Sequence, residues 1–208
     1  MQARGRRVPL SPGATALAGC PLRSAGLACA AIMARVQAPA HPARIAAPPT
    51  FSLPEFRASL GMFATGVTIV TARAPDGSPV GLTVNSFASV SLTPPLVSWN
   101  LASTSSSLAV FQGGTHYAVN VLGANQQALA QRFASPVSDR WAGVAWHPGV
   151  AGAPLIEGAV AHFECVGKSR YQEGDHVIFI GQVEHCDHRP GVAPLLFHGG
   201  RFYTETEL

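Results

Sequence analysis

The sequence lacks the motifs that identify several common enzyme classes. It has no Rossmann G-x-G-x-x-G, no P-loop and no G-x-S-x-G elbow, so neither a Gly-rich phosphate loop nor acyl transfer through an elbow serine is supported. No apolar stretch approaches the ~20 residues that a membrane-spanning helix needs, because Gly, Pro, Ser or a charge interrupts the hydrophobic residues every few positions. These absences predict a soluble protein without a membrane partner.

Lysine is almost absent, and acidic residues are missing from one end of the chain. Lys168 is the only lysine beside thirteen arginines, which suggests a GC-rich bacterial gene. Residues 1–54 hold six arginines and no acid, whereas the remainder has eight basic and eleven acidic residues. The net charge of +3 therefore comes from the N-terminal segment. A mildly negative folded part lacks the basic surface that nucleic acid requires, so no nucleic-acid partner is predicted.

The four cysteines do not form a recognisable framework. Cys20 and Cys29 lie in the N-terminal segment, Cys165 and Cys186 lie in predicted strands, and no C-x-x-C pair occurs. Such spacing in a chain of 208 residues favours reduced, structural thiols over disulfides. A cytoplasmic, bacterial location is the corresponding expectation.

Residues 1–50 differ in composition from the rest of the chain. They are rich in Ala, Pro, Gly and Arg and show no sustained helical or strand period, which predicts disorder. The same composition resembles an organellar transit peptide, the apolar patch at 27–32 resembles a poor signal peptide, and translation from Met33 is a further alternative. We favour a disordered or mis-annotated extension, followed by one folded domain over residues 51–208.

The folded part is predicted to be rich in short strands. Ser52 and Glu55 fit a capping box for a helix that ends near Leu60, and Pro75-Asp76-Gly77 fits a hairpin turn. Many short strands with few helices favour a β-barrel over alternating βαβ units. Strands are expected at 67–74, 79–84, 87–91, 96–101, 117–121, 159–166, 176–184 and 195–197, and short helices at 106–111 and at 125–133 with Asn125 as its cap.

Small polar residues interrupt two of these strands, between Pro79 and Leu101. A strand built only for packing would carry Val, Ile or Phe there, since a buried polar group without a partner costs about 1–3 kcal/mol. The polar positions therefore indicate either hydrogen bonds to a ligand or, more simply, polar strand ends and a turn. They are Thr83, Asn85, Ser86, Ser98 and Asn100.

Several motifs together resemble those of the flavin reductase family, small NAD(P)H:flavin oxidoreductases that feed two-component monooxygenases. The resemblance covers residues 51–203, and its motifs are Gly66-Val-Thr-Ile-Val-Thr71, Gly81–Leu96, Ala118-Val-Asn-Val-Leu122, Arg132-Phe-Ala134, Trp141-Ala-Gly-Val144, Pro154-Leu-Ile-Glu-Gly158 and Gly174-Asp-His176 followed by Val-Ile-Phe-Ile-Gly181. It implies a mainly β fold, a Greek-key, FMN-binding split β-barrel with a few short helices. It also implies a homodimer with the flavin near its interface.

The resemblance further implies the chemistry. Hydride passes from NADH or NADPH to FMN or FAD, and the reduced flavin diffuses to a partner monooxygenase. No residue acts as a catalytic acid or nucleophile, because the cofactor carries the chemistry. A non-enzymatic flavin-binding or storage barrel and a barrel that only mediates protein association are the alternatives. The sequence does not decide between the two flavins or between the two nucleotides.

The residues that the resemblance assigns to the cofactors lie in several segments. The serines could instead be helix caps, Arg132 a solvated surface cation and His176 a turn residue, so each assignment has a structural alternative. His176 is assigned to the nicotinamide and Tyr203 to a cover over the flavin. The full set is Thr83, Val84, Asn85, Ser86, Ser98, Trp99, Asn100, Leu101, Ser105, Ser106, Ser107, Asn120, Gln131, Arg132, His176 and Tyr203.

The run Glu184-His185-Cys186-Asp187-His188 has the residue types of a metal site. Alternation along a strand sends neighbouring side chains to opposite faces, so four convergent ligands are not expected. We predict no metal.

Overall fold

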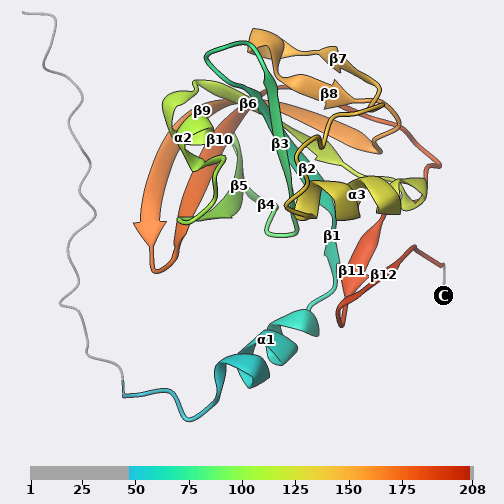
Figure 1. The fold of residues 1–208 in the computed structure, drawn as a ribbon. Helices are drawn as coiled ribbons and strands as arrows, with labels where there is room; N and C mark the ends of the chain where they lie inside the picture. The colour runs from blue at the N-terminus through green and yellow to red at the C-terminus, as the bar shows by residue number, and fades with distance from the viewer. Residues whose placement is uncertain (1–46, 207–208) are drawn as a thin grey trace, which may run out of the picture. The chain divides into compact units, whose positions relative to one another are not determined.

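Antiparallel β-strands dominate the computed structural model, which describes residues 47–206 (Figure 1). Seven strands form one sheet in the order β3-β2-β6-β9-β10-β5-β4, and smaller sheets have the orders β1-β11-β12 and β7-β8. The tail cysteines, the start at Met33 and the expected disorder of residues 1–46 fall outside the described range. Residues 47–50, to which the same expectation extends, are described and form no helix or strand. The mainly β fold class with few short helices is confirmed.

The elements follow one another along the chain with short connections. The helical segments are α1 (Leu53–Gly61), α2 (Leu108–Gly113), η1 (Ala124–Gln126), α3 (Gln127–Ala134) and η2 (Val150–Gly152). The strands are β1 (Thr65–Gly66), β2 (Thr68–Arg73), β3 (Pro79–Val84), β4 (Ala88–Leu92), β5 (Pro95–Ala102), β6 (His116–Val121), β7 (Trp146–Pro148), β8 (Pro154–Ile156), β9 (Ala161–Glu173), β10 (His176–His188), β11 (Leu196–His198) and β12 (Arg201–Tyr203).

Strand β2 is buried on both of its faces. Val70 points to a core cluster built around Trp99 and Phe179, whereas Ile69 points to a second cluster with Phe133. Successive side chains of a strand point to opposite faces, so a strand between two cores has no need of alternating polar positions. This explains why five of the six residues of β2 are buried.

Helix α1 begins as the sequence predicts. The side chain of Ser52 accepts a hydrogen bond from Glu55 N, and Glu55 Oε2 accepts one from Ser52 N at 2.7 Å, which completes the capping box. None of its residues is buried. The bond from Gly199 N to Gly61 O, 2.8 Å long, ties its end to the β11–β12 turn.

Most predicted elements are confirmed, with three differences. Asn125 does not cap α3, because it lies inside η1; the N-cap of α3 is Gln126, and its Oε1 accepts from Gly123 N, at the start of η1, at 3.0 Å. Strands β9 and β10 extend beyond their predicted ends to 13 residues each, because they pair with one another along almost their whole length. Strands β1, β7, β8 and β12 were not predicted, since runs of two or three residues carry no periodic signal.

None of the helices within residues 47–206 has the length and apolar character that crossing a bilayer requires.

Candidate functional site

A cavity of about 510 Å³ opens where the ends of β3 and β5 approach one another. We call it the main cavity. Its volume falls in the range of small-molecule and cofactor sites. It is lined by Leu82, Thr83, Val84, Asn85, Ser86, Asn100, Leu101, Ala102, Ser105, Ser106, Phe133, Ala134, Arg140 and His176.

The two strands meet here without forming a ladder. Strand β3 stands at one end of the seven-strand order and β5 next to the other, so the sheet curls to bring them together (Figure 1). Asn100 N donates to Ser86 Oγ at 2.9 Å and joins the chain after β3 to β5. A side chain makes this connection in place of a backbone ladder, and the cavity lies at this gap between the two strands.

The side-chain amides of two asparagines line the cavity. Asn85 follows β3 and Asn100 belongs to β5. Within the described residues, neither side chain makes a hydrogen bond to another part of the protein. By contrast, Thr83 Oγ1 already donates to Ala130 O at 2.7 Å. The amides of Asn85 and Asn100 are therefore available to a ligand with donors and acceptors along its edge.

The ionisable side chains that line the cavity are Arg140 and His176, and no carboxylate lines it. His176 Nδ1 lies 2.8 Å from Asp175 Oδ1 at the start of β10. The hydrogen bond from His176 and its charge lower the pKa of the exposed Asp175 carboxyl. The cavity thus has a cationic wall at Arg140 and an imidazole at its rim.

Comparison with known proteins identifies this arrangement. Residues 60–206 match the family model described as a flavin reductase like domain. The chain is 47% identical over 147 residues to the FMN reductase (NADH) SmoA of Agrobacterium fabrum, over 71% of this chain and 83% of that protein. This chain belongs to the flavin reductase family.

Other relatives agree with this assignment. Identity to the reductase subunit HsaB of a flavin-dependent monooxygenase from Mycobacterium tuberculosis is 39%, over 71% of this chain and 79% of that protein. The reductase component of a trigonelline monooxygenase from Acinetobacter baylyi is 41% identical over 72% of this chain, which spans 48% of its length. The NADH:FAD oxidoreductase SgcE6 of Streptomyces globisporus, solved with NAD and FAD fragments, superposes with a TM-score of 0.70 at 41% identity, over 74% and 92% of the two chains.

The flavin reductase fold brings nine of the sixteen predicted site residues to the main cavity. These nine are Thr83, Val84, Asn85, Ser86, Asn100, Leu101, Ser105, Ser106 and His176. Their binding role remains a prediction. What the fold adds is their convergence, since they come from β3, β5, the segment before α2 and the start of β10.

Trp99 is placed in the core instead of the cavity. It is 0% exposed and stacks on Phe179, with ring centroids 4.5 Å apart. Its neighbours in β5, Ser98 and Asn100, point to the other face, because side chains alternate along a strand. Of these two only Asn100 lines the cavity, because the cavity lies at the C-terminal end of β5 and Ser98 is farther from that end.

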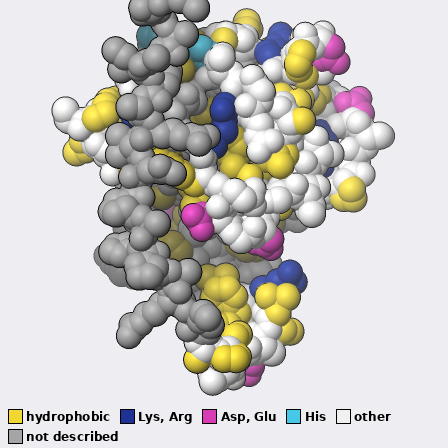
Figure 2. All heavy atoms as spheres, turned by 90° about the vertical axis from the view of Figure 1, so that its left-hand side faces the viewer, with side chains coloured by type: hydrophobic (Ala, Val, Ile, Leu, Met, Phe, Trp, Pro, Cys, Tyr) yellow, Lys and Arg dark blue, Asp and Glu magenta, His cyan; other side chains and the backbone are white. Residues whose placement is uncertain are grey.

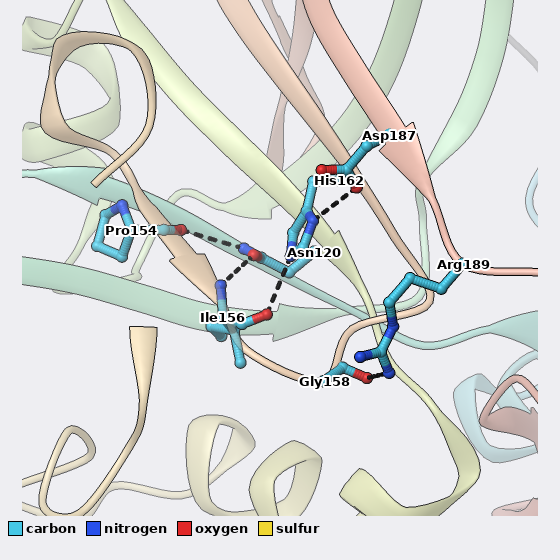
Figure 3. Close-up of polar contacts among 7 residues, drawn as sticks. All are labelled: Asn120, Pro154, Ile156, Gly158, His162, Asp187 and Arg189. Atoms are coloured by element: carbon cyan, nitrogen blue, oxygen red, sulfur yellow. Dashed lines mark hydrogen bonds and ion pairs between the residues drawn. The ribbon is translucent and has the colours of Figure 1, made fainter. Parts of the chain in front are cut away.

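Asn120 is buried in a structural network away from the cavity (Figure 3). Its Nδ2 donates to Ile69 O at 3.0 Å, and its Oδ1 accepts from Ile156 N at 2.7 Å. The ring of His162 bridges Ile156 O at 2.9 Å and Asp187 Oδ1 at 2.8 Å. Asn120 therefore holds β8 against β6, and this role accounts for its polar side chain within an apolar strand.

The remaining predicted residues lie outside the main cavity. Arg132 is exposed on α3 and donates from Nη1 to Ala142 O at 2.7 Å, and its neighbour Gln131 is also exposed. Tyr203 lies on β12 with its side chain 48% exposed. Ser107 is buried and lines a neighbouring cavity.

Arg140 is the charged cavity residue that sequence reasoning missed. It follows Ser-Pro-Val-Ser-Asp in an irregular segment after α3, where no period predicts which side chain turns inward. Nearby, Asp139 Oδ1 accepts from Trp141 N at 3.1 Å and from Ala142 N at 3.0 Å. An aspartate at this position predicts a turn. It does not predict whether the arginine that follows points into a cavity or into solvent.

The Glu184–His188 run does not converge on one point. Glu184 lies 3.4 Å from His116, and Asp187 pairs with His162. In the part of the chain that the structure describes, no group of three His, Cys, Asp or Glu side chains is placed to hold a metal ion. Cys186 is exposed, whereas burial raises the pKa of the Cys165 thiol to about 12.

Proposed function

We propose that the main cavity binds the ring of FMN or FAD and that NADH or NADPH reduces it there. The single observation that carries this proposal is that the side-chain amides of Asn85 and Asn100 both line the cavity and make no hydrogen bond to other groups within residues 47–206. Such groups match a ring with polar atoms along its edge. Membership of the flavin reductase family supports the same activity.

The chain's own residues would bind and orient the reactants. When bound, the flavin supplies the redox chemistry by accepting a hydride from the nicotinamide. Asn85 and Asn100 would fix the ring, and Arg140 would place a positive charge near the negative charge that collects on reduction. His176, exposed at the rim, would contact the nicotinamide. Alignment of the reactants then accounts for much of the acceleration.

A reduction assay with both flavins and both nucleotides tests the proposal. With NADH or NADPH present, flavin absorbance should fall faster than in a protein-free control. The Asn85→Ala variant should weaken flavin binding by about threefold to tenfold, as expected for one lost hydrogen bond. Asn125→Ala, an exposed asparagine on η1, should leave binding unchanged. Flavin binding without nucleotide oxidation would instead identify a storage protein.

We infer that the reduced flavin leaves the cavity for a partner monooxygenase. Several relatives are reductase components of monooxygenases by name, which supports this partner class. After anaerobic reduction, ultrafiltration should recover reduced flavin in the filtrate. Retention of all reduced flavin with the protein would contradict diffusible transfer. We also infer a cytoplasmic site of action, because the cysteine spacing favours reduced thiols and thiols stay reduced in the cytoplasm.

We also infer that the chain forms a homodimer through the apolar side of α1 and its flanking residues. The exposed apolar side chains there include Phe56 at 44%, Met62 at 67% and Phe63 at 76%. Figure 2 shows hydrophobic side chains gathered at the lower end of the molecule, the level of α1 in Figure 1. A second copy of this chain would bury a helix that buries none of its own residues.

A further inference from the structure

The turn between β9 and β10 lies at the edge of the main cavity. It consists of Gly174 and Asp175, at the end of the long hairpin at the lower left of Figure 1. Gly174 has a φ of 58°, in the left-handed region that the common two-residue hairpin turns require at their first position. His176 follows as the first residue of β10, and its side chain lines the cavity. The position of the turn therefore affects a residue of the cavity wall.

Both carbonyl groups of this turn accept hydrogen bonds. Gln172 Nε2 donates to Gly174 O at 2.9 Å, and Ser103 N donates to Asp175 O at 2.8 Å. The same Nε2 donates to Ser103 Oγ at 2.9 Å. A carbonyl oxygen can only accept, so the amide nitrogen of Gln172 is the atom that faces the turn. The side chain of Gln172 thus connects the turn to the loop that follows β5.

The loop after β5 forms another part of the cavity wall. Ala102, Ser105 and Ser106 line the cavity, and Ser105 N donates to Ala102 O at 3.0 Å. Ser103 lies within this loop and is exposed. Gln172 is also exposed and does not line the cavity. It therefore acts on the cavity only through the two segments that its amide connects.

The turn also holds the ring of His176. Asp175 Oδ1 lies 2.8 Å from His176 Nδ1, and the hydrogen bond from this ring lowers the pKa of the Asp175 carboxyl. An ionised carboxylate can only accept, so Nδ1 carries the proton that is shared with it. In a neutral ring, Nε2 is then an acceptor. The carboxamide N–H of a nicotinamide is a donor that matches it.

We propose that Gln172 is a positioning residue for His176. Its amide holds the turn against Ser103 and so keeps Asp175 where the carboxylate fixes the proton on Nδ1 of the ring. A glutamine suits this role because its amide has two N–H donors, one for each acceptor. The proposal rests on the proposed function, because that function brings the nicotinamide to His176. Gln172 itself touches neither reactant.

The protonated nitrogen of the His176 ring tests the proposal without turnover. NMR of ¹⁵N in alkaline solution, where a histidine ring is neutral, shows which nitrogen carries the proton, and His176→Gln identifies the signal. The Nδ1–H form should dominate in wild type. Gln172→Leu keeps much of the side-chain bulk but removes both donors, so it should change the ratio of the two forms about threefold to tenfold toward Nε2–H.

A glutamine on another element provides the matched control. Gln112→Leu, at an exposed position of α2, should leave the ratio of the two ring forms unchanged. Because Gln172 and Gln112 are both exposed, the urea midpoint of unfolding should be the same in both variants. An Nε2–H ring in wild type, or the same ratio in wild type and Gln172→Leu, would overturn the proposal.

Steady-state kinetics with the nucleotide that wild type oxidises, NADH or NADPH, provide the second measurement. Gln172→Leu should raise the KM for that nucleotide about threefold to tenfold and leave kcat within about twofold, as loss of a contact made equally before and during hydride transfer implies. Ser103→Ala should raise the KM in the same direction, and Ser103→Thr, which keeps the hydroxyl, should restore it.

The two variants should also be coupled. Adding Ser103→Ala to Gln172→Leu should raise the KM no further, because both remove the same contact. An unchanged KM in Gln172→Leu would contradict the positioning role. Absence of nucleotide oxidation by wild type would count against the proposed function alone, since the protonated nitrogen of the ring is read without it.

Discussion

At the scale of single residues, the proposed binding role of the cavity depends on polar side chains that make no hydrogen bond within the part of the chain that the structure describes. Asn85, Asn100 and Asn120 look alike in the sequence, each within or beside an apolar strand. The structure separates them, because the Asn120 side chain is hydrogen-bonded to backbone groups of β2 and β8, whereas the other two line a cavity. A buried amide is costly unless it is paired, so burial distinguishes a structural asparagine from a binding one.

Gly81 is required by close packing beside the cavities. A Cβ at this position would lie 2.8 Å from Phe133 Cε1 and 3.1 Å from Trp141 Cζ2. We expect Gly81→Ala to lower the free energy of unfolding by about 1–3 kcal/mol through overpacking, measured by urea denaturation. Gly113→Ala is the control, because a Cβ there meets nothing within 4 Å. Equal stability of the two variants would contradict this reading.

The pair of His176 and Asp175 should be visible in a titration. The hydrogen bond from His176 and its charge lower the pKa of Asp175, so His176→Gln should raise that pKa toward the ordinary value of about 3.9. A carboxyl whose pKa is lowered on folding stabilises the protein above its unfolded pKa, and this contribution is lost as the pH falls through the folded pKa. Carboxyl-carbon NMR measures the shift, and an identical Asp175 titration in both proteins would exclude the contact in solution.

At the scale of elements, the three-residue strand β8 pairs with β7 and is also held by side chains of β6 and β9. Ile156 contributes its N–H to Asn120 and its carbonyl to His162 (Figure 3). This explains why the segment Pro154–Gly158 belongs to the motif that resembles the family although it does not line the main cavity. Its role is structural, because its hydrogen bonds hold β8 against the side chains of Asn120 on β6 and His162 on β9.

Removing Asn120 should therefore affect stability more than binding. Asn120→Ala leaves the buried Ile156 N–H and Ile69 carbonyl short of a partner, and we expect a loss of about 2–3 kcal/mol in the free energy of unfolding. Chemical denaturation gives the stability, and fluorescence titration of the folded variant gives its flavin affinity. A large loss of affinity at unchanged stability would show instead that Asn120 contacts the flavin.

At the scale of the whole molecule, the inferred homodimer predicts a change in mass. Phe63→Asp places a charge on an apolar side chain that is 76% exposed, so it should convert a dimer into a monomer in analytical ultracentrifugation. Because Phe63 buries little surface within its own chain, the folded domain should keep its circular dichroism spectrum. Val90→Asp alters another exposed apolar side chain, on β4, and is the control. A monomeric wild type would refute the inference.

The sequence by itself determined the family, the strand-rich character and local features such as the capping box of α1 and the turn at Pro75–Gly77. These features depend on residues near one another in the chain, or on motifs whose order is read directly. Tertiary structure alone decided that Asn100 lines the cavity while Asn120 is buried in a network, and that Arg140 turns inward while Arg132 stays on the surface. The physical reason is that the segments packed against a side chain decide whether it is buried, lines the cavity or faces solvent. Curling of the seven-stranded sheet brings β3 and β5 together although they lie far apart in its strand order.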